Sequence, residues 1–69
     1  MMFDYTELKT EMTRQKVRLV DLAEKTGISI GTLSQKMKHG RPFGCDQAWR
    51  IAQAMNLPEV DSYFFKVEL

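Results

Sequence analysis

The 69-residue sequence is poor in the residues that brace many small domains: it has one cysteine, one histidine, two prolines and four glycines. A single thiol, Cys45, cannot form an internal disulfide, and no cluster of cysteine and histidine indicates zinc. We therefore expect no metal and no other cofactor. With so little proline and glycine, and with no repeats, the sequence leaves no room for a linker, so residues 1–69 are predicted to form a single domain.

Long hydrophobic runs are also missing, although 43% of the residues are hydrophobic. No apolar run approaches the length of a membrane span or of the apolar core of a signal peptide. This absence favours a soluble cytoplasmic protein that does not bind a membrane. The apolar fraction is sufficient for one compact core, but a chain of this length has no room for a deep active-site cleft.

Groups that could carry out catalysis are isolated from one another in the sequence. His39 is the one histidine, and Cys45 has no histidine-assisted arrangement, which predicts a small thiol that is buried or half-buried. Asp21 and Glu24 lie three residues apart, as ordinary surface charges do on a helix. The sequence therefore predicts that the protein is not an enzyme and has no small-molecule substrate.

Neither sign of charge dominates, since the net charge is +1, but the distribution is uneven. Residues 14–50 contain eight basic and three acidic side chains, a net charge of +5, whereas the stretches before and after them each sum to −2. Positive charge is thus concentrated in the middle of the chain, as binding to a polyanion such as DNA requires. Because this excess is modest, an ordinary solvated helical surface is the alternative explanation.

The most informative stretch is residues 19–37, LVDLAEKTGISIGTLSQKM. It contains two short amphipathic segments joined at a tight turn around Gly27, which can adopt a positive φ without a Cβ clash. Small Ala23 allows the two helices to approach closely, Leu33 fills the angle between them, and Ser29 can cap the second helix. This combination is typical of a helix-turn-helix, whose second helix lies in the major groove of DNA. A helical hairpin without a nucleic-acid role is the alternative.

Apolar spacing and capping residues predict four helices followed by a short fifth helix and a strand. The expected elements are helices over residues 5–15, 19–26, 30–38 and 45–55, a short helix from Pro58 through Tyr63, and a strand from Phe65 onward. Gly40 and Asn56 suit the left-handed positions that end the third and fourth helices. Asp4 can cap the first helix, and Glu7 can reach back to its start. The fold is therefore predicted to be all-α.

The core is expected where the apolar faces of these helices meet. Its predicted members share a helical spacing around the Gly27 corner: Leu22, Ala23, Ile28, Leu33, Ile51, Ala52 and Met55. Met12 and Met37 also fit core positions, and Phe43 is expected to fold back onto the core. Trp49 is expected to take part in core or interface packing rather than to stack on a nucleobase.

The chain resembles the Cro/CI-type (XRE) family of helix-turn-helix proteins over nearly its whole length. The resemblance lies in a helix-turn-helix at the second and third of four to five short helices, and in three segments: Met2-Phe3-Asp4-Tyr5, Leu33-Ser34-Gln35-Lys36-Met37 and Tyr63-Phe64-Phe65. These segments are similar to those of a small phage-borne branch of the family. The resemblance implies a transcriptional regulator that binds operator DNA as a homodimer in the cytoplasm of a bacterial host, often as a repressor in a phage lysis–lysogeny switch.

The resemblance also implies which residues contact DNA. Bases are read from the start and the exposed face of the third helix, where the Gln35 amide is suited to pair with N6 and N7 of adenine. Hydroxyls and basic side chains nearby contact bases or phosphates, and phosphate contacts give affinity rather than sequence reading. The full set expected at the DNA is Arg18, Ser29, Ile30, Gly31, Thr32, Ser34, Gln35, Lys36, Lys38, His39 and Arg41.

The chain departs from the family at two pairs of positions. Relatives frequently carry glutamine at the first exposed positions of the third helix, where this chain has Ile30 and Gly31. They also often begin the second helix with Ser or Thr followed by Gln, where this chain has Arg18 and Leu19. Arg18 can still contact a phosphate, but Leu19 cannot, and Ile30 can touch only a thymine methyl group. These apolar residues indicate an alternative to the favoured DNA ligand: a modulator or antirepressor that uses the same surface to bind a co-encoded repressor protein and block its DNA binding.

The last residues are predicted to form a dimer or partner interface composed of Phe64, Phe65, Val67 and Leu69. Phe65, Val67 and Leu69 would line one face of a strand. A chain this small has little spare core to cover them, so an exposed apolar edge favours pairing with a second copy. Two alternatives stay open: the tail can fold back on the first helix and Trp49, or a partner protein can use it.

Overall fold

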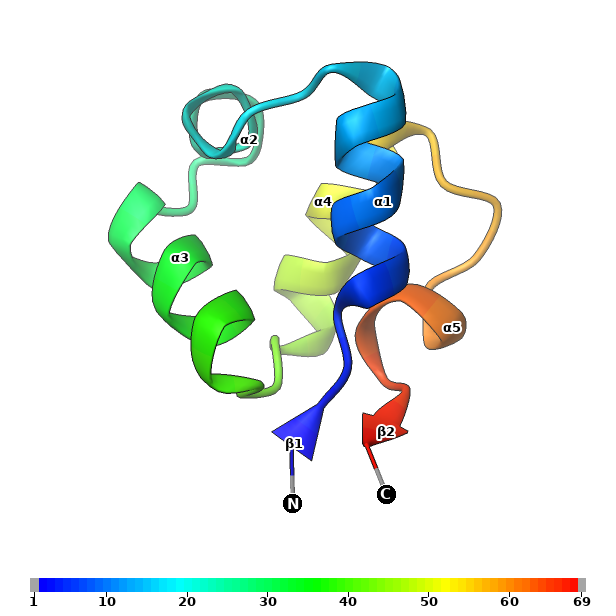
Figure 1. Cartoon of the computed structure of the whole chain (residues 1–69). Helices are drawn as coiled ribbons and strands as arrows, with labels where there is room; N and C mark the ends of the chain where they lie inside the picture. Colours follow the sequence, from blue (N-terminus) through cyan, green and yellow to red (C-terminus); the bar gives the residue numbers. More distant parts are fainter. Residues whose placement is uncertain (1, 69) are drawn as a thin grey trace.

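The computed structural model describes residues 2–68, apart from the side chain of Glu68. Within that range the chain forms five helices and two very short strands (Figure 1): β1 (Met2–Phe3), α1 (Thr6–Gln15), α2 (Leu19–Thr26), α3 (Ile30–His39), α4 (Cys45–Met55), α5 (Asp61–Phe64) and β2 (Val67–Glu68). The prediction of an all-α domain is confirmed at this level, with one strand pair beside the helices.

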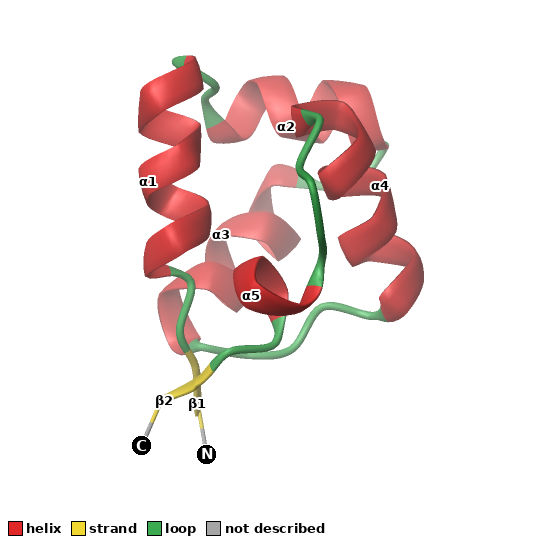
Figure 2. Ribbon diagram, turned by 90° about the vertical axis from the view of Figure 1, so that its right-hand side faces the viewer, coloured by secondary structure: helices red, strands yellow, loops and turns green. Residues whose placement is uncertain are grey.

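The helices surround one core instead of forming a parallel bundle. α2 packs on both α3 and α4, and α1 packs on α5. In Figure 1, α2 and α3 lie on one side of α1, and α5 lies on the other. The two strands meet below the helices, where Figure 2 shows both ends of the chain close together. α3 therefore lies at the edge of the molecule, and residues such as Gln35 and Lys38 on its outer side are exposed.

Three helices end in the same backbone arrangement, which turns the chain sharply without proline. The residue after each helix has a left-handed backbone: Lys16 (φ 58°), Gly40 (φ 64°) and Asn56 (φ 55°). The next N–H then donates to a carbonyl five residues earlier: Val17 to Met12 at 2.9 Å, Arg41 to Lys36 at 3.0 Å, and Leu57 to Ala52 at 2.9 Å. These bonds satisfy carbonyls that the helix itself leaves free. The predictions for Gly40 and Asn56 are confirmed, whereas Lys16 was not anticipated.

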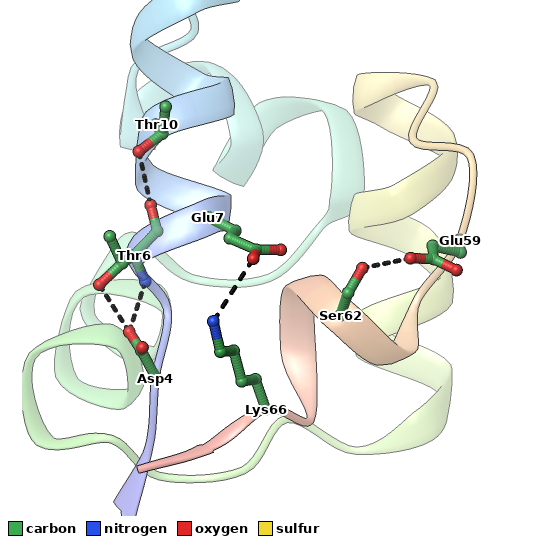
Figure 3. A network of polar contacts seen from close by, with 7 residues as sticks. All are labelled: Asp4, Thr6, Glu7, Thr10, Glu59, Ser62 and Lys66. Atoms are coloured by element: carbon green, nitrogen blue, oxygen red, sulfur yellow. Dashed lines mark hydrogen bonds and ion pairs between the residues drawn. The ribbon is translucent and has the colours of Figure 1, made fainter.

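The start of α1 differs from the prediction. The helix begins at Thr6, one residue later than expected, and the Asp4 carboxylate accepts the Thr6 N–H at 2.9 Å and the Thr6 hydroxyl at 2.6 Å. Asp4 therefore bonds to the first helical residue, but the predicted cap is not formed: Tyr5 occupies the N-cap position without a side-chain cap bond, and Glu7 does not reach back. Figure 3 shows that Glu7 faces the ammonium group of Lys66 instead, at 3.5 Å, because the tail of the chain runs beside α1.

Most other predicted boundaries are confirmed. Helices over residues 19–26 and 45–55 match α2 and α4, and α3 runs one residue beyond the predicted end, to His39. The short helix is displaced: it begins at Asp61 rather than at Pro58, because residues 58–60 form a bend before it. The tail strand is present as Val67–Glu68.

The predicted core residues are almost all found inside. The buried hydrophobic side chains are Tyr5, Leu8, Met12, Leu22, Ile28, Leu33, Met37, Phe43, Ala48, Ile51, Ala52, Met55 and Phe64. Of the seven predicted members, only Ala23 is half-buried. The prediction for Cys45 is wrong, since its thiol is exposed at the first position of α4. Trp49, with 57% exposure, is not part of the core, so of its two predicted roles interface packing stays a prediction.

An aromatic cluster joins segments that are distant in the sequence. The Phe43 ring meets Tyr5 edge-on at 5.5 Å and Phe64 edge-on at 5.8 Å between ring centroids. Such edge-to-face pairs are each worth about 0.5–1.5 kcal/mol beyond the area they bury. Phe43 folds back onto the core as predicted. Phe64, in contrast, was predicted at an interface, but it is fully buried and cannot meet a partner.

The tail strand pairs with the beginning of the chain itself. β1 and β2 are antiparallel, with Met2 opposite Glu68 and Phe3 opposite Val67. Phe65, another predicted interface residue, is half-buried and meets Phe3 edge-on at 6.1 Å. Among the expected alternatives, the tail therefore folds back within the chain, although onto β1. Leu69, the last predicted interface residue, lies outside the described residues.

We expect Leu33→Ala to lower the free energy of unfolding by about 2–5 kcal/mol, because the leucine is fully buried between α2 and the rest of the core and its loss leaves a cavity. Urea denaturation followed by circular dichroism measures the change. Gln35→Ala, on the exposed side of the same helix, serves as control and should stay within about 0.5 kcal/mol of the parent. An unchanged midpoint for Leu33→Ala would contradict the register of α3.

Gly40 is predicted to tolerate no side chain. A Cβ there would lie 2.9 Å from the Met2 Cβ and 3.0 Å from the Phe3 carbonyl oxygen, and the left-handed backbone alone disfavours alanine by about 1–2 kcal/mol. Gly40→Ala should therefore lower the melting temperature. Gly31→Ala is the matched control: a Cβ on this helical residue meets no atom within 4 Å, so it should stabilise the protein by about 0.5–1 kcal/mol. Equal effects of the two substitutions would refute the contact between α3 and β1.

Candidate nucleic-acid interface

The exposed side of α3 carries most of the residues predicted to read bases. Leu33 and Met37 are buried and attach the helix to the core. On the other side, Ile30 is 48% exposed, and Gly31 and Gln35 are exposed as well. Ser34 and Thr32 are half-buried at the border between the two sides. The predicted base-reading residues are therefore together on one helix, and most of them face solvent.

The first turn of α3 is held by its own hydroxyl groups. The Ser29 Oγ accepts the Thr32 N–H at 3.2 Å, and the Ser29 hydroxyl donates to the Thr32 Oγ1 at 2.8 Å. The cap predicted for Ser29 is thus present. Both side chains serve the helix start, so a DNA contact from Ser29 would have to share an oxygen already used for the cap.

The corner between α2 and α3 is fixed by Thr26, a residue that the sequence analysis missed. Its buried hydroxyl donates to the Leu22 carbonyl oxygen at 2.6 Å and accepts the Ile28 N–H at 3.2 Å. Gly27, between Thr26 and Ile28, has the positive φ predicted for this turn, at 76°. A threonine at a helix end gives only a weak signal in the sequence, because the same residue is common on exposed surfaces. Its bonds connect the last turn of α2 to the backbone of the turn that leads into α3.

Arg18, a predicted phosphate contact, is exposed but paired. Its backbone N–H donates to the Asp21 carboxylate at 3.0 Å, and its guanidinium lies 3.3 Å from the same carboxylate. The first of these bonds, then the second, hold the pKa of the Asp21 carboxyl below its ordinary value. Part of the positive charge of Arg18 is therefore balanced by Asp21 before any phosphate approaches.

Lys36 was also predicted to contact phosphate, but it is directed toward the protein. Its ammonium group donates to the Gln47 Oε1 at 2.7 Å and lies 5.4 Å from the centre of the Phe43 ring. The same Gln47 oxygen accepts the Gly44 N–H at 3.1 Å, which caps α4. Lys36 thus ties α3 to the start of α4 and stabilises the fold instead of extending into solvent.

The last turn of α3 and the loop after it place three basic residues at the surface. Lys38, His39 and Arg41 are exposed. The loop is held in place because the Tyr5 hydroxyl donates to the Arg41 carbonyl oxygen, and burial raises the pKa of that phenol. Cations at this end of a helix also interact favourably with its dipole. These three side chains are the predicted phosphate contacts that the structure leaves in reach of a ligand.

Neither a metal site nor a membrane-spanning helix is found in the described part of the chain. Among residues 2–68, histidine, cysteine, aspartate and glutamate side chains nowhere gather in a group of three that could hold a metal ion. None of the helices in that part of the chain is long and apolar enough to cross a membrane.

We expect Asp21→Asn to lower the melting temperature at neutral pH, because the charged acceptor for the Arg18 N–H is lost. Since the pKa of Asp21 is lowered by folding, its contribution is present above the ordinary value of 3.8 and disappears as the pH falls through the lowered value. The difference between variant and parent should therefore shrink on acidification to about pH 2. Glu24→Gln, on the same helix, is the control and should have a smaller effect at neutral pH. A difference in melting temperature that stays constant at all pH values would contradict the bond between the Arg18 N–H and the Asp21 carboxylate.

The arrangement can bind an extended anion, with an amide-bearing helix face beside exposed cations. Gln35 offers a donor and an acceptor, Lys38 and Arg41 offer positive charge, and Ile30 offers an apolar contact. No family model, no curated protein and no solved structure matches the chain.

Proposed function

We propose that the protein is a small transcriptional regulator of the phage type, a Cro/CI-like helix-turn-helix domain that binds operator DNA with α3 in the major groove. The observation that carries the proposal is the two-sided character of α3. Leu33 and Met37 are buried on one side of the helix. Gln35 in the middle of the helix and Lys38 in its last turn are exposed. A helix with one anchored and one free polar side is what reading of base edges requires.

The dimensions and the chemistry of α3 support this proposal. Its 10 residues span about 15 Å, and the major groove, about 12 Å wide, admits a helix. Gln35 would pair with an adenine, Ile30 would contact a thymine methyl group, and Ser34 would bond to a base or phosphate. Lys38, with His39 and Arg41, would contact phosphates and give most of the affinity.

A second copy is part of the proposal, because one such helix contacts only a half-site. In proteins of this motif class, two recognition helices lie about 34–36 Å apart on the same side of DNA. Within the described residues β2 pairs with β1 alone, which leaves the other edge of β2 for a second copy. Phe64 and Phe65 are used inside the chain, so the interface would be smaller than the one predicted from the sequence.

Two exposed apolar side chains, one on α2 and one on α3, favour a second candidate function. Ile30 is 48% exposed, and Val20 on α2 is 43% exposed. Neither residue can donate or accept a hydrogen bond through its side chain, whereas both suit an apolar protein contact. The candidate is a modulator that binds a co-encoded repressor through the exposed residues of α2 and α3 and blocks the DNA binding of that repressor.

The DNA proposal predicts two different effects of substitution. Gln35→Ala should relax the preference at one operator position by about 1–3 kcal/mol, because only a base contact is lost. Lys38→Ala should weaken binding to all sequences alike and reduce the salt slope by about 1, because a phosphate contact is lost. Fluorescence anisotropy with duplex fragments from the neighbouring genomic DNA, at two salt concentrations, measures both.

Lys25→Ala is the matched control, since this exposed lysine lies on α2 outside the proposed interface and its loss changes the net charge equally. Sedimentation of the same samples gives the number of copies on each duplex. If no duplex is bound at low salt, the DNA proposal is wrong. Binding of a co-encoded repressor under those conditions, reduced by Ile30→Glu, would establish the modulator function in its place.

A further inference from the structure

A groove of about 470 Å³ opens between α1, the start of α2 and α3. It is lined by residues from these three helices and from the link between α1 and α2: Lys9, Met12, Thr13, Val17, Leu19, Ser34, Met37 and Lys38. Its volume lies within the range of about 300–1,000 Å³ that is usual for small-molecule sites. Size alone therefore allows a ligand larger than an inorganic ion.

The lining combines an apolar surface with positive charge. Four of the lining side chains are apolar: Val17 and Leu19 are half-buried, whereas Met12 and Met37 belong to the core and are each only 8% exposed. The charged ones are both lysines, Lys9 from α1 and Lys38 from α3, and none of the described lining residues is acidic. An occupant that matches this surface has an apolar body and a negative group.

The two lysines lie where the groove meets a second hollow. This hollow, of about 300 Å³, is bordered by the β1–α1 link and again by Lys9, Met37 and Lys38. Asp4 also borders it, but the Asp4 carboxylate is bonded to Thr6, and these bonds hold the pKa of that carboxyl below its ordinary value. No ion pair of Lys9 or Lys38 is found among residues 2–68. Neither ammonium group is therefore held in a direct ion pair, although the charge of Lys9 contributes, after the Thr6 bonds, to the lowered pKa of the Asp4 carboxyl. Both can still bind an anion that enters the groove.

We propose that this groove binds a small amphiphilic carboxylate, with its apolar chain on Met12, Val17, Leu19 and Met37 and its carboxylate between Lys9 and Lys38. Contact between the chain and the apolar side chains provides the favourable transfer from water. The two lysines orient the molecule and discriminate against neutral analogues. The site lies in the present arrangement of the three helices and needs no second copy.

Such a ligand would share residues with the DNA-binding surface. Ser34 and Lys38 line the groove and also belong to the proposed interface. A bound carboxylate would neutralise Lys38, so ligand and DNA would compete. This consequence depends on the proposed function, whereas ligand binding itself does not.

The test is a titration of the ¹⁵N-labelled full chain, without DNA, with octanoate below its micelle concentration, followed by amide chemical shifts. Saturable shifts are expected around the groove, at residues such as Thr13, Leu19 and Ser34. Octanol, which lacks the charge, and acetate, which lacks the chain, should both bind more weakly. Lys9→Gln and Lys38→Gln should each weaken octanoate binding about two- to fivefold, as loss of one exposed ion pair does.

Lys25→Gln, an exposed lysine that does not line the groove, is the control and should leave octanoate binding unchanged. The proposal is overturned if octanol binds as tightly as octanoate, if Lys25→Gln has the same effect as Lys9→Gln, or if the shifts do not saturate. Binding to phosphatidylglycerol vesicles without a response to octanoate would also overturn it, in favour of a membrane surface. None of these outcomes depends on whether the chain binds DNA.

Discussion

The contact of Phe43 with Tyr5 and Phe64 is the interaction on which the rest of the structure depends. It joins the beginning of the chain, the loop after α3 and the last helix, which no disulfide connects. The Tyr5 hydroxyl also donates to the Arg41 carbonyl oxygen, and Lys36 lies over the Phe43 ring. The same cluster therefore closes the core and holds the C-terminal end of α3, so the position of the candidate interface is a consequence of core packing.

The sequence predicts those parts of the fold that depend on neighbours along the chain. Helical spacing predicted α2 and α4 over the residues at which the structure has them. The residue types of Gly27, Ser29 and Gly40 predicted a turn, a helix cap and a helix end. The parts that were missed depend on distant partners. β1 has two residues, too few for a periodic pattern. It forms because it pairs with β2 and because the Phe3 N–H donates to the Gly40 carbonyl oxygen at 2.9 Å. Phe64 was predicted at an interface for the same reason, because the residues next to it in the sequence do not indicate its contact with Phe43.

The candidate site was predicted by residue type more reliably than by the direction of each side chain. Gln35 and Lys38 are exposed where the helical period places them, because Leu33 and Met37 fix the opposite side. Lys36, on the same helix, was also expected to face a ligand, but it is half-buried because the loop after α3 brings Gln47 and Phe43 close to it. A basic residue on a helix can thus serve the fold or a ligand, and only its long-range partners decide which.

Gly31 is the position where the requirements of the fold and of the proposed function separate most clearly. Glycine in a helix destabilises it by roughly 0.5–1 kcal/mol relative to alanine, and an added Cβ here would meet no atom within 4 Å. Nothing inside the described structure therefore requires glycine, in contrast to Gly40, where Met2 and Phe3 exclude a side chain. A missing side chain on the exposed first turn of α3 lets another molecule approach the helix backbone closely. The proposed interface would give this glycine a role, whereas the stability of the fold gives it none.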